Sequence, residues 1–140
     1  MVDVLAVDRV IVLTPALEEA VEQFERLGFD FGDPVEMEVG GEVIASRLDW
    51  SGLDLMTPKR EGTELSAYLD AEGPGLYGLV LRIDDLDSAK RDLAADGIDP
   101  MDEYEVGDVS EALYHPRHFS GVLVTLAEYS PRHPLEEAVE

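Results

Sequence analysis

Two of the chain's three histidines could bind a metal, judging by their type and spacing. His115 and His118 stand three residues apart, just before the apolar run 122–127. An H-x-x-H pair suits a metal when a helix carries both side chains on one face, but Pro116 disfavours a helix interior here. No Glu or Cys with recognisable ligand spacing accompanies the pair. We therefore expect a turn before a strand, with His115 as a candidate ligand contact at a cavity mouth.

Nucleophilic catalysis has no support in the sequence. The chain contains no cysteine, which excludes disulfides, thiolate nucleophiles and cysteine-ligated zinc or iron–sulfur sites. No serine lies in a G-x-S-x-G elbow, and neither a P-loop nor a G-x-G-x-x-G motif is present.

The elements that would position any site occur twice along the chain. Each copy is expected to contain a strand, a helix and three short strands, in that order. The expected strands are 4–13, 35–39, 42–48 and 52–57 in the first copy, and 78–83, 100–104, 109–115 and 122–128 in the second. A shift of 69 positions places Leu17 on Leu86, in the core, and Gly28 on Gly97, at a helix stop. The sequence therefore predicts a βαβββ–βαβββ chain.

The two helices are expected to begin at recognisable residues. Thr14-Pro15 is typical of an N-cap followed by a first-turn proline, and Asp84 or Asp85 is expected to cap the second helix.

A length of 140 residues suffices for one core and is short for two ordinary domains. We expect one domain over residues 1–140. Its parts are module one (4–58), a polar linker (59–75), module two (76–129) and an acidic tail (130–140) that holds His133. No apolar run approaches the roughly 20 residues of a membrane helix, and the N-terminus does not read as a signal peptide. We therefore expect a cytoplasmic protein.

The charge of the chain is strongly negative. It has 32 acidic and 10 basic residues, for a net charge of −22. Such a surface repels nucleic acid and anionic membranes, so neither is an expected partner. It also repels itself unless salt at molar concentration shortens the Debye length to about 3 Å. We interpret the charge as adaptation to a salt-rich cytoplasm, the alternative being an ordinary acidic protein.

Alternation along the strands predicts one apolar and one mixed face for each sheet. The expected helix-facing residues are Val10, Val12, Leu53, Leu55, Leu79, Leu81, Ile83, Val122, Val124 and Leu126. The expected residues of the mixed face are Arg9, Ile11, Leu13, Asp54, Met56, Gly78, Val80, Arg82, Leu123, Thr125 and Ala127. A mixed face of this kind commonly lines a ligand cavity.

The duplicated order and several short motifs resemble the vicinal oxygen chelate superfamily of glyoxalases, bleomycin-resistance proteins, extradiol dioxygenases and methylmalonyl-CoA epimerases. The epimerase branch is the most similar. The matching stretches are Val7-Asp8-Arg9-Val10, Leu76-Tyr77-Gly78-Leu79, Arg82-Ile83-Asp84-Asp85-Leu86-Asp87, and His115-Pro116 followed by Gly121-Val122-Leu123-Val124-Thr125-Leu126. The resemblance implies an α+β, glyoxalase-like fold: two βαβββ modules form a curved mixed sheet around a cavity, with the helices outside. It also implies a homodimer.

The resemblance further implies a divalent metal held by four side chains, and this chain lacks most of them. The family's ligand positions fall on Arg9, Gly78, Asp54 and Thr125. Arginine is protonated and has no lone pair to offer, glycine has no side chain, and threonine is a poor ligand. Because a magnesium, manganese or zinc site needs about three or more oxygen or nitrogen ligands, we predict no metal and no cofactor.

Two interpretations of Arg9 and Asp54 stay open. In the first, Arg9 binds an anionic group of a ligand, such as a carboxylate, an enolate or a phosphate. In the second, Arg9 and Asp54 form an ion pair that fills the former metal site, because a buried unpaired charge is very costly. The two interpretations are compatible if a ligand shares Arg9 with Asp54.

Arg47, Tyr114 and Thr125 are further candidate ligand contacts. Arg47 is expected on the cavity-facing side of its strand, and the structural alternative is a surface ion pair. Tyr114 is expected at the cavity mouth, and the structural alternative is a core position. The resemblance places the catalytic glutamate of the epimerases at Arg47 or, because of a local gap, equally at Val43 or Glu42.

Three functional classes follow. The first is a metal-free protein that binds a small, possibly anionic molecule, as bleomycin-resistance relatives do. The alternative is an enzyme of the glyoxalase, epimerase or dioxygenase type with displaced metal ligands or a metal-free mechanism. The third is an interaction module without a ligand.

Overall fold

The computed structural model describes residues 2–39 and 41–129. These residues form two compact units. The N-terminal unit is Asp8–Leu79, and the C-terminal unit combines residues 2–7 with residues 80–129. The expected acidic tail, with His133, lies outside the described residues.

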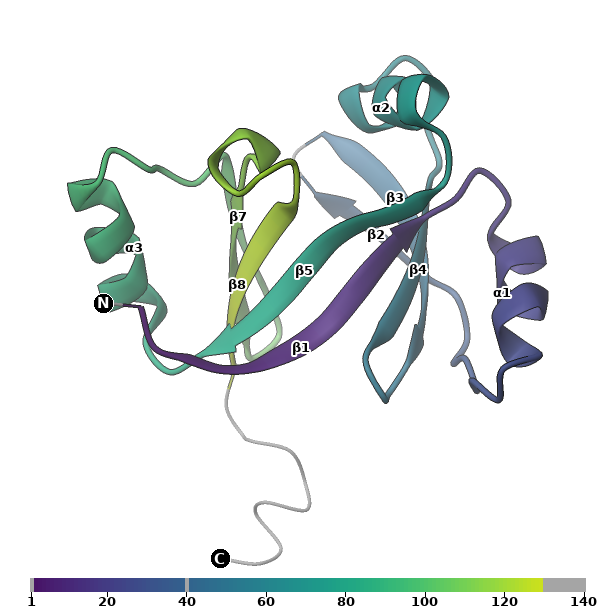
Figure 1. Cartoon of the computed structure of the whole chain (residues 1–140), viewed down its shortest axis with the longest axis horizontal. Coiled ribbons are helices and arrows are strands. Elements are labelled where there is room, and N and C mark those ends of the chain that lie inside the picture. Colours follow the sequence, from purple (N-terminus) through teal and green to yellow (C-terminus); the bar gives the residue numbers. More distant parts are fainter. Residues whose placement is uncertain (1, 40, 130–140) are drawn as a thin grey trace, which may run out of the picture. The chain divides into compact units, whose positions relative to one another are not determined.

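The N-terminal unit is a four-stranded sheet with a helix packed on one of its faces (Figure 1). Its elements are β1 (Val4–Leu13), α1 (Leu17–Glu25), β2 (Val35–Val39), β3 (Glu42–Asp49) and β4 (Leu53–Pro58). The strands lie in the order β2-β3-β4-β1, with β1 parallel to β4 and the other neighbours antiparallel. On the helix side, Ala20 and Val21 of α1 pack against Val12 and Leu55, as the alternation of the strands predicted.

Asp49 holds the end of β3 in place. Its carboxylate accepts hydrogen bonds from the backbone N–H groups of Asp30 and Ser51, both at 2.7 Å, and from the Ser51 hydroxyl. The pKa of Asp49 is lowered, first by the hydroxyl bond from Ser51 and then by the backbone bonds from Asp30 and Ser51. Asp49 therefore ties the β3–β4 turn to the loop that follows α1.

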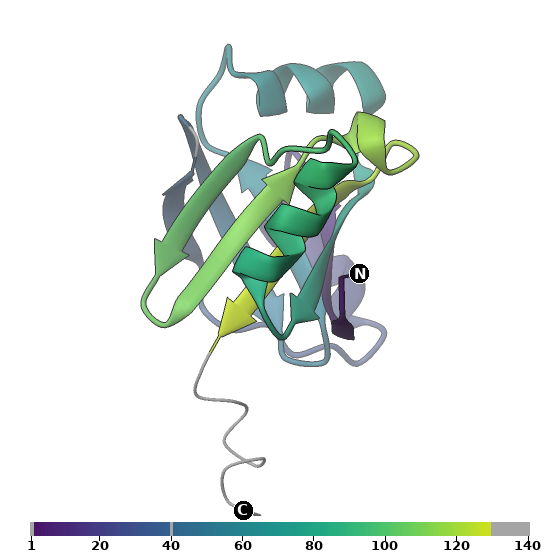
Figure 2. The ribbon, with the colours of Figure 1, turned by 90° about the vertical axis from the view of Figure 1, so that its left-hand side faces the viewer.

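The C-terminal unit repeats the arrangement, with a helix lying across one face of its strands (Figure 2). Its elements are the part of β5 (Gly75–Ile83) that follows Leu79, then α3 (Leu86–Ala95), β6 (Asp102–Val106), β7 (Val109–Tyr114), the 3₁₀ turn η1 (Pro116–His118) and β8 (Leu123–Tyr129). The strands lie in the order β5-β8-β7-β6, and β6–β7 and β7–β8 are antiparallel. Ile83, Val124 and Leu126 form the core under α3 with Leu86 and Ala89.

The starts of the two helices differ in how well the sequence predicted them. Asp85 caps α3 by accepting a hydrogen bond from the backbone N–H of Ser88 at 3.0 Å, as expected. Thr14, by contrast, is not the cap of α1, which begins after Ala16 and has no side-chain cap. The backbone N–H of Thr14 donates to the carbonyl of Met56 at 2.9 Å. This bond keeps Thr14 paired with β4. Its hydroxyl accepts a hydrogen bond from the backbone N–H of Ala16, which precedes α1.

The expected linker 59–75 contains a helix that the sequence analysis missed, α2 (Glu64–Glu72). Thr63 caps it by accepting from the backbone N–H of Ser66 at 3.2 Å. Its buried residues Leu65 and Leu69 pack against Leu13 and Ile44. The segment is therefore part of the core of the N-terminal unit.

The fold class is confirmed: the protein is α+β, and it consists of two βαβββ modules with mixed strand pairing. That the modules enclose a cavity stays a prediction. No described helix is long and apolar enough to cross a membrane.

Candidate functional site

Each sheet has a second face, opposite α1 in the N-terminal unit and opposite α3 in the C-terminal unit, which we call the distal face. In the N-terminal unit the distal face carries Arg9, Ile11 and Leu13 of β1 and Asp54 and Met56 of β4. Ile11 lies directly opposite Asp54, and Leu13 opposite Met56. Paired residues project from the same side of a sheet, so the predicted mixed face is present.

Arg9 and Asp54 form the ion pair that the second interpretation of these residues predicted. The Arg9 Nε donates to Asp54 Oδ2 at 3.3 Å, and the Arg9 Nη1 lies 3.0 Å from Asp8 Oδ2. The Asp54 side chain is 8% exposed, whereas those of Arg9 and Asp8 are 23% and 21% exposed. The guanidinium of Arg9 therefore pairs with the buried carboxylate of Asp54 and also with the more accessible carboxylate of Asp8.

This arrangement puts a protein cation where the family resemblance expects a metal cation. Arg9 offers only N–H donors and no lone pair, so it cannot be a metal ligand. Within residues 2–39 and 41–129, no group of three or more His, Cys, Asp or Glu side chains is placed to hold a metal ion. The side chains that are present therefore fit an ion pair and do not fit the family's metal.

Thr125 lies on the distal face of the C-terminal unit and is 3% exposed. It stands opposite Leu113, and its neighbour along that face, Ala127, stands opposite Glu111. Glu111 is buried, at 4% exposed, and accepts a hydrogen bond from the hydroxyl of Tyr104. The sequence analysis missed this buried carboxylate–phenol pair. The available signal was the β7–β8 alternation, which places Glu111 and Thr125 on one face.

The expectation that Arg47 faces a cavity is wrong. Arg47 lies opposite Leu55, on the helix side of β3. Its Nη1 lies 2.7 Å from Glu18 Oε2 of α1, and its Nε donates to the carbonyl of Gly32 at 2.8 Å. Arg47 therefore joins α1, β3 and the loop after α1, in line with the alternative of a structural ion pair.

Tyr114 does not lie at a cavity mouth. It is fully buried in the core under α3, in edge contact with Phe119 at a ring-centroid distance of 6.3 Å. Burial raises the pKa of its hydroxyl, with Glu103 as the next cause. The expected ligand contact is thus a core aromatic, because Tyr114 lies on the same face of β7 as Ala112.

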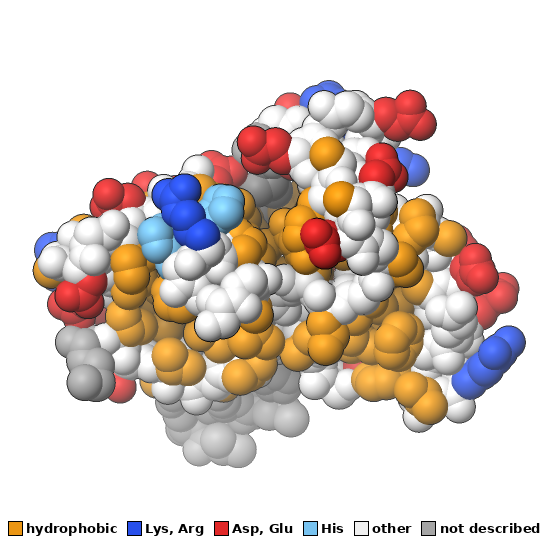
Figure 3. All heavy atoms as spheres, turned by 45° about the horizontal axis from the view of Figure 1, so that its top comes forward, with side chains coloured by type: hydrophobic (Ala, Val, Ile, Leu, Met, Phe, Trp, Pro, Cys, Tyr) orange, Lys and Arg blue, Asp and Glu red, His pale blue; other side chains and the backbone are white. Residues whose placement is uncertain are grey.

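The two histidines lie in a turn, as expected. His115 is exposed and precedes η1, and its Nδ1 accepts a hydrogen bond from the backbone N–H of Arg117 at 3.0 Å. Figure 3 shows histidine side chains at the surface of the molecule. Their place in a 3₁₀ turn removes the helical spacing that a metal-binding H-x-x-H pair needs. A ligand contact by His115 stays a prediction.

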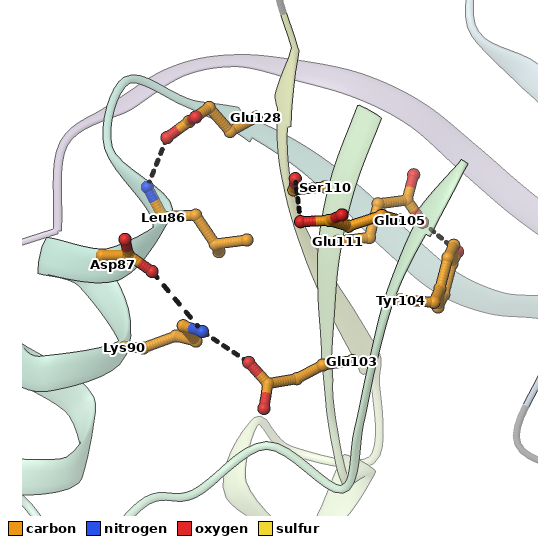
Figure 4. A pocket seen from close by; sticks show the side chains of 9 residues that line it. All are labelled: Leu86, Asp87, Lys90, Glu103, Tyr104, Glu105, Ser110, Glu111 and Glu128. Atoms are coloured by element: carbon orange, nitrogen blue, oxygen red, sulfur yellow. Dashed lines mark hydrogen bonds and ion pairs between the residues drawn. The ribbon is translucent and has the colours of Figure 1, made fainter. Parts of the chain in front are cut away.

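A groove of about 510 Å³ between α3 and the β6–β7 strands is lined mainly by acidic residues (Figure 4). Its charged groups already serve the fold. Lys90 Nζ lies 2.5 Å from Glu103 Oε1 and 3.6 Å from Asp87 Oδ1, and Glu128 Oε1 accepts from the backbone N–H of Leu86 at 2.7 Å. The bond to Glu103 is the largest cause of the raised pKa of Lys90. The charged residues of the groove therefore connect α3 to the neighbouring strands by hydrogen bonds and ion pairs.

The register of β3 divides the candidate positions for the epimerase glutamate between the two faces, with Arg47 on the helix side. Val43 lies opposite Glu38, on the helix side. Ile44 packs with Leu13 and Leu69 on the distal face. Glu42, two residues before Ile44, therefore lies on the distal face.

Comparison with known proteins agrees with this architecture. The family model described as Glyoxalase/Bleomycin resistance protein/Dioxygenase superfamily matches residues 8–114. The chain belongs to this superfamily. No curated protein matches the chain.

Several solved structures share this fold. Methylmalonyl-CoA epimerase from Mycobacterium tuberculosis is 25% identical, with a TM-score of 0.76 over 98% of this chain and 93% of that one. A variant of the Streptomyces coelicolor epimerase, in complex with 2-nitronate-propionyl-CoA, is 22% identical, with a TM-score of 0.76 over 92% of this chain and 97% of that one. A hypothetical protein from Bacillus halodurans is 14% identical, with a TM-score of 0.76 over 91% and 96%. The epimerases are thus among the structural neighbours of the chain.

The Arg9–Asp54 ion pair predicts a specific pattern of stability changes. The substitution Arg9→Ala leaves the buried carboxylate of Asp54 without this partner. We expect a loss of about 2 kcal/mol in the free energy of unfolding, less than for a fully buried pair because Arg9 is partly exposed. The measurement is urea unfolding at a fixed, high KCl concentration.

A double variant and a control variant isolate this effect. Arg9→Ala combined with Asp54→Asn should recover most of the loss, because the buried charge is removed. Arg91→Ala, at an exposed position of α3, should change stability little. Equal stability of Arg9→Ala and the unmodified protein would show that the pair contributes nothing.

Proposed function

We propose that this chain is a metal-independent member of the superfamily that binds a small molecule at Arg9. The observation that carries the proposal is the Arg9–Asp54 ion pair, at two positions where the family resemblance expects metal ligands. The bound 2-nitronate-propionyl-CoA of a structural neighbour supports a small-molecule ligand. As in relatives, we expect a homodimer.

The charges around Arg9 specify how a ligand would bind. Arg9 contributes one positive charge, and Asp8 and Asp54 contribute two negative charges, so the three side chains carry a net charge of −1. A third anion therefore cannot simply be added to this group. Asp8 is the more exposed of the two carboxylates, and we propose that a carboxylate, enolate or phosphate of the ligand takes its place on Arg9. Asp54 keeps the guanidinium oriented, as a charge-assisted pair does.

This exchange can be tested by thermal-shift measurements at constant high salt. Suitable probes are malonate, inorganic phosphate and coenzyme A. We expect at least one probe to raise Tm in proportion to its binding, and to do so more strongly with Asp8→Asn, which removes the competing carboxylate. The same probe should give no shift with Arg9→Ala. A shift that Arg9→Ala retains would place the ligand elsewhere.

The alternative is an enzyme of the glyoxalase, epimerase or dioxygenase type with displaced metal ligands. The structural likeness to methylmalonyl-CoA epimerases favours this alternative. In an epimerase reaction a base removes the proton next to the thioester carbonyl, and the resulting enolate needs stabilisation by a cation. Arg9 is a cation that could supply it without a metal.

Elemental analysis and proton exchange separate the two proposals. In protein purified without chelator, we expect far less than one divalent metal ion per chain, because the described residues offer no ligand group. Methylmalonyl-CoA incubated with the protein in D₂O should gain no deuterium at C2 beyond the buffer rate, as followed by NMR. One metal per chain, or enzyme-dependent deuterium uptake, would instead favour the enzyme.

We further propose that the protein works in a salt-rich cytoplasm. The net charge of −22 on 140 residues produces self-repulsion that dissolved ions screen. Raising KCl from about 0.1 M, where the Debye length is about 10 Å, to 1 M, where it is about 3 Å, should raise Tm strongly. The measurement is thermal unfolding followed by circular dichroism. A Tm that does not change over this range would contradict the proposal.

A further inference from the structure

Glu42 has a carboxylate oxygen without a partner. Its Oε1 is shielded from solvent and accepts no hydrogen bond from any residue in 2–39 or 41–129. Folded proteins rarely leave a buried polar atom in this state, and a carboxylate is the most costly group to leave so. This oxygen is therefore available to meet a donor or a cation of a bound molecule.

Two tyrosines pack against the apolar cluster that includes Ile44, which lies two residues after Glu42 on the same face of β3. Tyr68 of α2 and Tyr77 of β5 lie in edge-to-face contact, with ring centroids 5.0 Å apart and an interplanar angle of 61°. Both flank the apolar cluster of Leu13, Ile44, Leu65 and Leu69. The rings are only partly buried, so a dissolved molecule can reach them.

The hydroxyl of Tyr77 reports a negative environment. Its pKa is raised to about 12, first by burial and then by Tyr68, Glu42 and Glu64. The phenol therefore stays neutral at physiological pH, and its ring keeps the negative face that attracts cations. The carboxylates of Glu42 and Glu64 and the ring faces of Tyr68 and Tyr77 thus all favour a positively charged group.

Two basic residues that lie close to the start of β3 in the fold direct their side chains elsewhere. Arg60 Nη1 lies 3.9 Å from Glu38 Oε1 and donates to the carbonyl of Gly41 at 3.5 Å. Glu38 belongs to the helix side of its strand, because it pairs with Val43. Lys59 lines a groove beside α1, with Glu18 and Glu36. Neither residue supplies the positive charge that Glu42 lacks.

We propose that Glu42, Tyr68 and Tyr77 form a binding site for an organic ammonium group. The carboxylate supplies the counter-charge, and the two rings supply apolar contact and cation–π attraction. The site is separate from Arg9. Glu42 lies six residues before Leu48, which pairs with Asp54, and this corresponds to about 20 Å along β3. A molecule bound at Glu42 alone therefore does not need the proposed function at Arg9.

The proposal can be tested with choline as the cationic probe and 3,3-dimethylbutan-1-ol as its uncharged analogue. Each is titrated into isotopically labelled protein at constant total ionic strength, and NMR follows the ring signals of Tyr68 and Tyr77. We expect saturable shifts with choline and none with the alcohol. Glu42→Gln should weaken choline binding about tenfold, which corresponds to losing one charge-assisted interaction.

Two control variants locate the effect. Glu72→Gln removes a negative charge from the exposed end of α2 and should leave choline affinity unchanged. Arg9→Ala should also leave it unchanged, which separates this site from the proposed one. Glu42→Gln should keep or raise Tm, because it removes a charge whose Oε1 is shielded and has no partner within the described residues. The proposal is overturned if choline does not saturate, if the alcohol binds equally well, or if Glu42→Gln retains full affinity.

Discussion

Each sheet of this protein buries one face against a single short helix, and this constraint assigns every strand residue to one of two faces. Val12 and Leu55 lie under α1, so their strand neighbours Ile11, Leu13, Asp54 and Met56 must project from the distal face. Because a strand alternates with a period of two, no residue can serve both roles. The helix side therefore packs under α1, while the distal face carries both apolar core residues and the buried polar residue Asp54.

The distal face of the N-terminal unit is itself divided. At one end, α2 covers Leu13 and Ile44 with Leu65 and Leu69. At the other end, Asp54 lies buried and is held by Arg9. The polar residues thus stand beyond the segment that α2 packs against. The packing of α2 consequently sets where apolar burial stops and where charged side chains must find partners.

The sequence predicted the order of elements and most strand positions because period-two alternation and an apolar helix stripe are local signals. It misplaced Arg47 because alternation says which residues share a face and not which face meets the helix. Only the pairing of Arg47 with Leu55, and the contact with Glu18 of α1, decides this. It missed α2 because the nine residues of this helix carry just two buried leucines, too few for a clear apolar stripe. Glu111 was overlooked because its partner Tyr104 lies on another strand.

Arg9 supplies the positive charge that the buried carboxylate of Asp54 requires. Asp54 is buried and needs a positive charge nearby, whichever ion supplies it. A metal must be captured from solution, whereas a guanidinium on the neighbouring strand is always present at the site and stays protonated. The chain has only 10 basic residues against 32 acidic ones, and it places one of them here, beside two carboxylates. The electrostatic requirement of Asp54 is thereby met by a side chain of the protein itself.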